Sequence, residues 1–375
     1  MAKLENFNDP FDVYIRTLPE PDPDIKTLRV YTNEGVITKF ENLTYDTYRV
    51  VITCPEGSYK LSARAGQYGT IKVEGIQKPR SYSFAQTPEM ENSNEYTFFI
   101  RLVQGGELSG WLDAKDRTGE KVQLSGPMGK FGLDDSSRTI IGIAGGSGMS
   151  AINAIAQSAK VKNIARDFYF FYGARSQKDL YLVDELNEMG ESWPGGKTFK
   201  FIPVLSEEPE DSDWQGPRGF VTEHFKQEYL DKGIFSADDI TAFFCGPPPM
   251  IDHGVQVLEE AGLPSSHIYY DKFEDARSPA PVIDNTKCVL CDECLMAKPT
   301  KNCIVEATNF KLDDDGDEVT KFERVRPGHT SGLYYNSLFI DDNECIRCYA
   351  CIDACPHEAI SPSYAQVPTT LRKIS

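Results

Sequence analysis

Short runs of β-branched and aromatic residues, separated by glycine and proline, dominate the chain from residue 27 to about residue 136. The clearest runs cover residues 28–32, 48–53, 70–73, 96–103 and 121–124. Runs of this kind, with turn residues between them, are typical of strands in an antiparallel sheet. We therefore expect a closed antiparallel β-barrel over residues 27–136.

The hydrophobic pattern changes after Pro127. Strands are expected at residues 139–144, 168–173, 199–205 and 241–245, and helices at residues 149–159, 180–189, 221–229 and 250–261. Regular alternation of strand and helix predicts a parallel sheet covered by helices on both faces. This α/β domain is expected to span residues 137–275.

Polar, proline-rich segments lie on either side of these two domains. Residues 1–26 have the composition of an extended arm without a packed core. Residues 276–286 have a similar composition and are expected to link the α/β domain to a small last domain at residues 287–365. With 375 residues, the chain is long enough for two or three such domains.

The net charge of −18 argues against nucleic acid or an anionic membrane surface as a partner. An acidic surface suits a basic face on a protein partner. The first residues lack the apolar core of a signal peptide. Residues 139–159 are the most apolar stretch, but Gly, Ser, Asn and Gln interrupt it, so we expect no membrane span there.

Eight of the ten cysteines lie near the C-terminal end in two runs. The second run has the C-x2-C-x2-C-x3-C-P spacing of bacterial iron–sulfur sites, in which the fourth cysteine ligates the other cluster. A zinc site also uses C-x2-C pairs, but three-cysteine runs that end in Cys-Pro are not its pattern. A disulfide framework fits poorly, because thiolates without a secretion signal indicate a reducing cytoplasm.

This cysteine region resembles the two-cluster bacterial ferredoxins. The resemblance implies a small α+β ferredoxin-like domain that holds two 4Fe–4S clusters with crossed ligation. The expected ligands of one cluster are Cys288, Cys291, Cys294 and Cys355, and those of the other are Cys345, Cys348, Cys351 and Cys303.

Three further motifs have the chemistry of phosphate and ring binding. Arg80–Ser83 ends a barrel strand, where the arginine can clamp a pyrophosphate and the tyrosine can lie against a flat heteroaromatic ring. Gly105–Ser109 offers backbone amides ahead of a helix, and Gly145–Gly148 opens a helix after a buried strand. Taken singly, each motif also fits an ordinary turn, and Cys245 fits a small buried apolar residue.

Taken together and in this order, the motifs of residues 43–273 resemble the ferredoxin–NADP reductase superfamily, in particular the reductase components of bacterial oxygenases. The matching motifs are Gly66–Tyr68, Arg80–Ser83, Gly105–Ser109, Gly126–Gly129, Ala144–Gly148, Tyr172–Arg175 and Cys245–Met250. The resemblance implies FAD and a nicotinamide nucleotide, with Ser83 and Cys245 as catalytic residues beside the flavin and the nicotinamide. The residues implied in cofactor binding are Arg80, Ser81, Tyr82, Ser83, Gly105, Gly106, Leu108, Ser109, Gly145, Gly146, Ser147, Gly148, Arg175, Cys245, Gly246, Pro247 and Phe273.

The choice of nucleotide can be argued from the turn after the strand at residues 199–205. NADPH-using relatives often have a Ser-Arg pair there, whereas this chain has Ser206, Glu207 and Glu208. A carboxylate at this point repels a 2′-phosphate and can accept a ribose hydroxyl, so NADH is expected over NADPH. The alternative is that Arg175 binds the phosphate.

The order of the expected domains suggests an electron path. A nicotinamide gives up two electrons together, an iron–sulfur cluster takes one, and flavin can do both. We therefore expect electrons to pass from NADH to FAD, to the two clusters and to a protein acceptor.

Three functions fit such a path. The leading hypothesis is the reductase component of a multicomponent oxygenase, although familiar members carry a 2Fe–2S domain instead. The first alternative is an electron-transfer subunit of an anaerobic dehydrogenase or hydrogenase complex. The second is a redox sensor or binding module in which the clusters are structural.

Overall fold

The structure is a computed structural model that describes residues 30–86, 94–273, 280–284, 287–299, 303–309, 311–312, 318–319, 335–341 and 344–362. The described residues fall into two compact units, one before and one after the boundary between Asp275 and Ala276. The expected N-terminal arm at residues 1–26 lies outside the described residues. The same holds for residues 276–279 and 285–286 of the expected linker.

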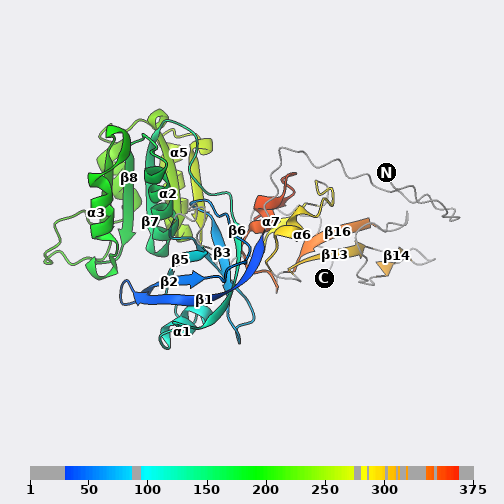
Figure 1. Cartoon of the computed structure of the whole chain (residues 1–375). Coiled ribbons are helices and arrows are strands. Elements are labelled where there is room, and N and C mark those ends of the chain that lie inside the picture. The colour runs from blue at the N-terminus through cyan, green and yellow to red at the C-terminus, as the bar shows by residue number, and fades with distance from the viewer. Residues whose placement is uncertain are drawn as a thin grey trace. The chain divides into compact units, whose positions relative to one another are not determined.

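The first six strands form one antiparallel sheet that is rolled into a nearly closed barrel (Figure 1). Its strand order is β4-β3-β6-β1-β2-β5. The two edge strands approach each other beyond β4, where Phe84 bridges to Phe98 and the Ala85 N–H donates to the Thr97 carbonyl at 2.8 Å. The barrel expected from the sequence is thus confirmed. The elements are β1 Tyr31–Asn42, β2 Thr47–Thr53, β3 Tyr68–Lys72, β4 Arg80–Ser83, β5 Glu95–Arg101, helix α1 Glu107–Asp113 and β6 Lys121–Met128.

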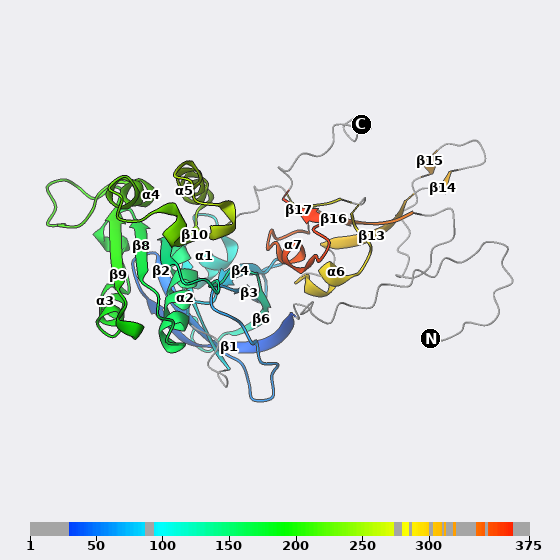
Figure 2. The ribbon, with the colours of Figure 1, turned by 90° about the horizontal axis from the view of Figure 1, so that it is seen from above.

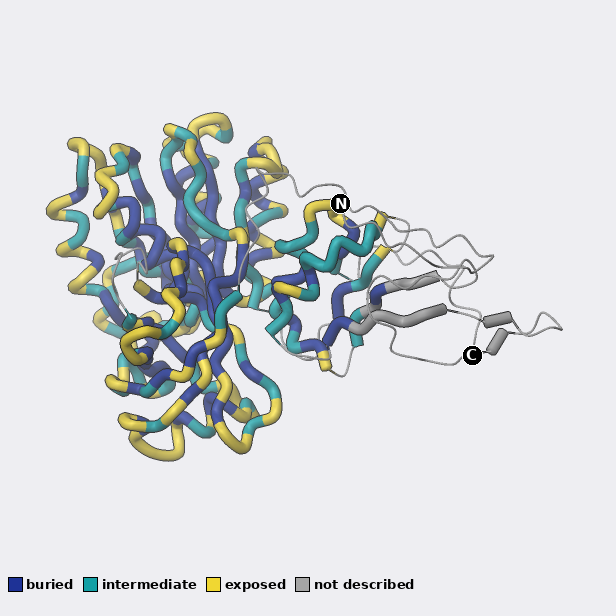
Figure 3. Tube along the Cα trace, turned by 45° about the vertical axis from the view of Figure 1, so that its right-hand side comes forward, coloured by how far each residue is buried: buried dark blue, intermediate teal, exposed yellow. Residues whose placement is uncertain are grey.

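The following elements form a five-stranded parallel sheet with the order β11-β10-β7-β8-β9. Helices α2 and α3 pack on one face and α4 and α5 on the other, as Figure 2 shows. Strands β7 and β10 are almost entirely buried, whereas the edge strand β11 is mostly not, and the exposed residues gather on the outside of the unit (Figure 3). The elements are β7 Thr139–Gly145, α2 Met149–Val161, β8 Phe168–Ala174, α3 Val183–Glu191, β9 Phe199–Leu205, α4 Val221–Phe225, β10 Ile240–Gly246, α5 Pro248–Glu260 and β11 Ile268–Lys272.

The order of the parallel strands reverses at β7. The chain adds β8 and β9 on one side of β7 and then returns to place β10 on the other side. The carboxyl ends of strands at such a reversal are where open α/β sheets bind ligands. The motif Gly145–Gly148 begins at the last residue of β7, and Cys245–Pro247 begins in the last two residues of β10, so both lie at this edge.

The C-terminal unit is built from short helices and two-stranded antiparallel sheets, in agreement with the expected α+β fold. Helices α6 and α7 pack against each other. Val282–Ile283, within the expected linker, forms a strand that pairs with β17. The elements are β12 Val282–Ile283, α6 Glu293–Ala297, β13 Ile304–Asn309, β14 Lys311–Leu312, β15 Glu318–Val319, β16 Tyr335–Ile340, α7 Ala350–Ala354 and β17 Ile360–Ser361.

None of the helices in the described part of the chain combines the length and the apolar character that a membrane crossing requires.

Candidate functional site

Ser83 and Cys245, the two residues expected to be catalytic, lie next to the same carboxylate. Ser83 Oγ donates a hydrogen bond to Asp271 Oδ2 at 3.4 Å, and Cys245 Sγ lies 3.9 Å from the same oxygen. Ser83 ends a barrel strand, whereas Cys245 and Asp271 belong to neighbouring strands of the parallel sheet. The barrel and the sheet therefore meet at this point.

Burial dominates the electrostatics of this cluster. It raises the pKa of the Cys245 thiol well above its ordinary value, and the charge of Asp271 raises it further. The thiol is thus kept neutral at physiological pH. Sequence analysis missed Asp271, which stands two residues before Phe273. Phe273 itself is held close by, because its N–H donates to the Gly246 carbonyl at 3.0 Å.

Arg80 lies beside the turn that was expected to receive a pyrophosphate. Its guanidinium donates to Glu107 Oε2 at 2.9 Å, and Glu107 is the first residue of α1. The hydroxyl of Ser109 accepts the Val103 N–H at 3.1 Å and so closes the turn on itself. The structure thereby brings together Arg80 and the segment Gly105–Ser109.

The other residues expected around the flavin differ in exposure. Gly105 has a φ of +73°, which favours glycine, and Gly106 is the N-cap of α1. The Leu108 side chain is buried in the barrel core, so only its backbone is available to a ligand. Burial raises the pKa of Tyr82, whose ring packs against the barrel core. Ser81 is exposed on β4.

The glycines at the end of β7 allow two backbone segments to approach closely. A Cβ on Gly148 would clash with the carbonyl of Cys245, and a Cβ on Gly246 would lie 2.8 Å from the Gly145 carbonyl oxygen. Ser147 lies within the 3-10 turn Gly146–Gly148 that leads into α2. The sequence therefore uses glycine here for close packing of the two expected nucleotide-binding turns against each other.

A cavity of about 200 Å³ lies at this edge of the parallel sheet. Its walls include the turn after β7, the turn after β8 and the start of α5. Ser206, which begins the turn after β9, also lines it. The residues of this cavity that were expected to bind a nucleotide are Gly145, Gly146, Arg175 and Pro247.

Three charged residues in the wall of the cavity were missed by sequence analysis: Asp46, Arg101 and Asp179. Arg101 Nε lies 2.9 Å from Asp46 Oδ2, and Arg101 also lies 4.0 Å from Asp179. These residues are far apart in the sequence and stand in no recognisable motif, so no sequence signal could have grouped them.

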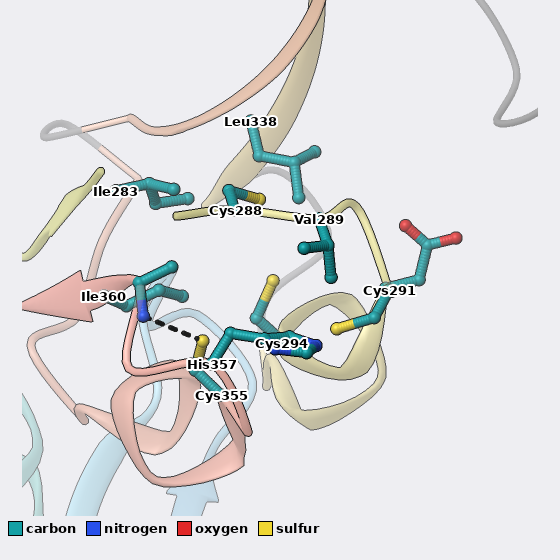
Figure 4. Close-up of a pocket in the computed structure, with 11 residues that line it drawn as sticks. Ile283, Cys288, Val289, Cys291, Cys294, Leu338, Cys355, His357 and Ile360 are labelled. Atoms are coloured by element: carbon teal, nitrogen blue, oxygen red, sulfur yellow. Dashed lines mark hydrogen bonds between the residues drawn. The ribbon is translucent and has the colours of Figure 1, made fainter. Parts of the chain in front are cut away.

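Four cysteines, drawn from both runs, surround a second cavity (Figure 4). Burial, followed by the neighbouring thiols, raises the pKa of Cys294 to about 12. The Ala359 N–H donates to Cys355 Sγ at 3.3 Å. The cavity is lined by Ile283, Cys288, Val289, Cys291, Asp292, Cys294, Leu338, Cys355, His357, Ala359 and Ile360.

The other four cysteines also lie together. Burial raises the pKa of Cys348 to about 12, and the nearby thiols of Cys303 and Cys345 contribute in the same direction. The Arg347 N–H donates to Cys345 Sγ at 3.4 Å. Burial also raises the pKa of Cys351. Crowded thiols of this kind ionise when a cationic metal centre compensates their charge.

The two cysteine runs share an unusual backbone pattern. Leu290 and Asp292, on either side of Cys291, have φ values of +57° and +64°. Arg347 and Tyr349, on either side of Cys348, both have a φ of +57°. A short helix follows each time, α6 or α7. The same loop geometry therefore occurs twice in the chain.

Thiolates, apolar walls and N–H···S hydrogen bonds form a donor set that fits iron–sulfur clusters. Among the described residues, no three His, Cys, Asp or Glu side chains are grouped closely enough to hold a single metal ion.

Comparison with known proteins gives three family matches. The oxidoreductase FAD-binding domain matches residues 34–132, the oxidoreductase NAD-binding domain residues 143–256, and the 4Fe-4S binding domain residues 338–361.

Two curated relatives are electron-transfer proteins of oxygenases. The xylene/toluene monooxygenase electron transfer component of Pseudomonas putida is 38% identical over 239 residues, which cover 64% of this chain and 65% of that protein. The phenol 2-monooxygenase reductase component of Pseudomonas sp. strain CF600 is 30% identical over 272 residues, which cover 72% of this chain and 73% of that protein.

Two solved structures share the fold. The ferredoxin reductase of carbazole 1,9a-dioxygenase has a TM-score of 0.56 and 26% identity, over 65% of this chain and 70% of that one. A cytochrome P450 reductase from Amycolatopsis has a TM-score of 0.58 and 29% identity, over 66% and 71% of the two chains.

The chain therefore belongs to the ferredoxin–NADP reductase family of FAD- and NAD-binding oxidoreductases. It is an oxidoreductase of the ferredoxin reductase type with a C-terminal 4Fe–4S domain. The family and the class of enzyme expected from the sequence are both confirmed.

Proposed function

We propose that this protein takes electrons from NADH and passes them through FAD and two 4Fe–4S clusters to the oxygenase component of a multicomponent oxygenase. The observation that carries the proposal is the meeting of Ser83 and Cys245 on Asp271, at the junction of the barrel and the parallel sheet. Hydride transfer requires the two rings in contact, and a junction lined from both sides can position them.

We infer a flavin site on the barrel side of this junction and a nucleotide site on the side of the parallel sheet. Arg80 and the Gly105–Ser109 turn would hold the FAD pyrophosphate, and the Gly145–Gly148 turn would hold the nucleotide. FAD, when bound, can accept electrons in pairs and release them one at a time. Asp271 orients the Ser83 hydroxyl, which donates a hydrogen bond to Asp271 Oδ2. The neutral Cys245 thiol adds no second negative charge beside Asp271.

We assign one cluster to Cys288, Cys291, Cys294 and Cys355, which share a cavity. The other cluster is assigned to Cys303, Cys345, Cys348 and Cys351. Within this group the neighbouring thiols help to raise the pKa of Cys348 and of Cys351. Clusters of this type need thiols kept reduced, so we also propose that the protein works in the cytoplasm.

NADH is the proposed nucleotide because two carboxylates follow β9. Glu207 is exposed, and Glu208 accepts the Gln177 N–H at 2.8 Å. That hydrogen bonding to Gln177 lowers the pKa of Glu208 and keeps it charged. Negative charge at this turn disfavours the 2′-phosphate of NADPH.

The oxygenase partner is proposed from the relatives, whose names describe electron transfer components of aromatic monooxygenases and dioxygenases. The net charge of −18 suits a basic docking face on that partner. Recovery of an oxygenase component with the native protein, in a pull-down followed by identification, would support the assignment. Recovery of a hydrogenase or dehydrogenase complex would replace it.

The cofactor path is tested by composition and by truncation. Anaerobically purified protein should carry one FAD and about eight iron and eight sulfide per chain. A chain that ends after Asp275 should still reduce ferricyanide with NADH, because hydride transfer uses only the first unit. It should lose most of its electron transfer to the natural acceptor. Stoichiometric zinc without iron, or full activity of the truncated chain with that acceptor, would contradict the path.

A further inference from the structure

Arg175 follows β8, and its guanidinium contacts acidic and hydroxyl groups from two parts of the first unit. Its Nη2 lies 2.8 Å from Tyr45 Oη, 3.4 Å from Asp179 Oδ1 and 3.7 Å from Asp46 Oδ2. Tyr45 Oη in turn donates to Asp179 Oδ1 at 2.8 Å. Asp46 and Tyr45 come from the β1–β2 loop of the barrel, whereas Asp179 follows β8.

The two carboxylates are more firmly held than the arginine. Asp179 accepts the Ser176 N–H at 3.0 Å and the Ser176 hydroxyl at 2.8 Å, and its side chain is only 9% exposed. Asp46 is paired with Arg101 at 2.9 Å and is 13% exposed. The Arg175 side chain is 47% exposed. The acids therefore define the position of the guanidinium, and not the reverse.

The backbone of Arg175 lies beside the turn that follows β9. The Ser206 N–H donates to the Ala174 carbonyl at 3.0 Å, and the Glu207 N–H donates to the Arg175 carbonyl at 2.8 Å. Both Arg175 and Ser206 line the cavity. An arginine at this place, if it were not engaged elsewhere, could form a bidentate pair with a phosphate on the adenine ribose.

We propose that Asp46 and Asp179 are specificity-determining residues, which hold the Arg175 guanidinium and so withhold it from the 2′-phosphate of NADPH. The proposal rests on the nucleotide site proposed above. Two arginines, Arg101 and Arg175, face two aspartates, so the local charge is balanced. Loss of either carboxylate leaves one positive charge in excess at the cavity, and that charge favours an added phosphate.

The variants Asp179→Asn and Asp46→Asn test this directly in the full-length holoenzyme. The probes are AMP and adenosine 2′,5′-bisphosphate, whose dissociation constants are measured by calorimetry. We expect the preference for the bisphosphate over AMP to rise about tenfold in each variant, the scale of one charge-assisted hydrogen bond. The ratio of kcat/KM for NADPH to that for NADH should rise in the same direction.

Three further variants separate the mechanism from its alternatives. Asp179→Asn combined with Arg175→Gln should return the preference to the wild-type value, because the freed guanidinium is gone. Asp231→Asn removes an exposed carboxylate that pairs with Lys226, away from the cavity, and should change nothing. Tyr45→Phe removes the hydroxyl that contacts Arg175 and Asp179, from a side chain that is half-exposed. It should raise the preference for the bisphosphate by a smaller factor. This variant keeps the test available if Asp179→Asn does not fold.

The outcomes distinguish this inference from the function on which it rests. If wild-type protein binds AMP and oxidises NADH but Asp46→Asn and Tyr45→Phe leave the preference unchanged, the inference is wrong and the nucleotide site stands. A raised preference for the bisphosphate that persists in the double variant with Arg175→Gln also overturns it. The cause would then be the net charge of the cavity and not the freed guanidinium. If wild-type protein neither binds AMP nor oxidises NADH, the proposed function itself fails.

Discussion

Gly148→Ala offers a quantitative test of the close packing at the end of β7. The added Cβ would clash with the carbonyl of Cys245, which is backbone and cannot turn away like a flexible side chain. Either the start of α2 or the end of β10 must move. Overpacking of this kind typically costs about 1–3 kcal/mol. For a unit of this size, each kcal/mol lowers Tm by roughly 2–4 °C, so we expect a fall of roughly 2–12 °C.

The assay follows Tm by flavin fluorescence and KM for NADH by steady-state kinetics. KM should rise because the displaced backbone belongs to both expected nucleotide-binding turns, whereas the flavin content of purified protein should stay near that of the wild type. The matched control is Gly110→Ala, since a Cβ there meets no atom within 4 Å and Gly110 lies in helix α1. Alanine in a helix is favoured over glycine by about 0.5–1 kcal/mol, so Tm should not fall.

The reasoning would be refuted by a Gly148→Ala protein with unchanged Tm and unchanged KM. It would also be refuted if Gly110→Ala destabilised the protein as much, because the effect would then not depend on the contact with Cys245.

Three shorter predictions concern other charged and ionisable groups. Arg80→Ala should lower the flavin content of purified protein, because it removes the proposed pyrophosphate clamp beside the Gly105–Ser109 turn. Full flavin occupancy would make Arg80 a surface residue only. Burial raises the pKa of Cys245, so the free energy of unfolding should fall as pH rises above the unfolded thiol pKa of about 8.5, and should fall less in Cys245→Ser. Parallel pH profiles for the two proteins would disprove this. Arg347 is buried beside Cys345, at the place that Leu290 occupies in the first run, so Arg347→Leu should lower the potential of one cluster in an EPR-monitored redox titration. Arg347→Lys should keep the potential near that of the wild type. Equal potentials in Arg347→Leu and the wild type would show that the charge of Arg347 does not affect the cluster.

The architecture of the first unit was predictable from periodicity, because nearly every buried strand contains an uninterrupted run of apolar or alternating residues. Most of β1 (Tyr31–Asn42) was missed, since the expected run covers only residues 28–32. Strand β11 was missed entirely. Its sequence, Ile268–Lys272, mixes aromatic and charged residues, and the strand lies at the edge of the sheet with one hydrogen-bonded neighbour. Missing this strand meant missing Asp271, whose position depends entirely on its pairing with β10.

The candidate sites were predictable to different degrees. Cysteine spacing alone pointed to crossed ligation, because Cys355 and the following proline belong to a recognisable pattern. The approach of Ser83 to Cys245 needed the family resemblance, since nothing local relates the two segments. The group around Arg175 was out of reach, because Asp46 and Asp179 become neighbours only when a barrel loop meets the parallel sheet.

The cysteines around the cavity in Figure 4 come from both cysteine runs, so a cluster held there, as proposed, would make the folding of the C-terminal unit depend on iron supply. Its described helices have five residues each and several of its strands only two, and its apolar cluster is small compared with those of the first unit. A cluster bound, as proposed, by Cys288 and Cys355 would cross-link segments far apart in the chain, and metal binding would then contribute directly to folding. Under iron starvation, a cell would accumulate chains in which the first unit is folded but the C-terminal unit is not assembled. Such molecules would go on consuming NADH with no route to their partner, and oxygen would become the adventitious electron acceptor.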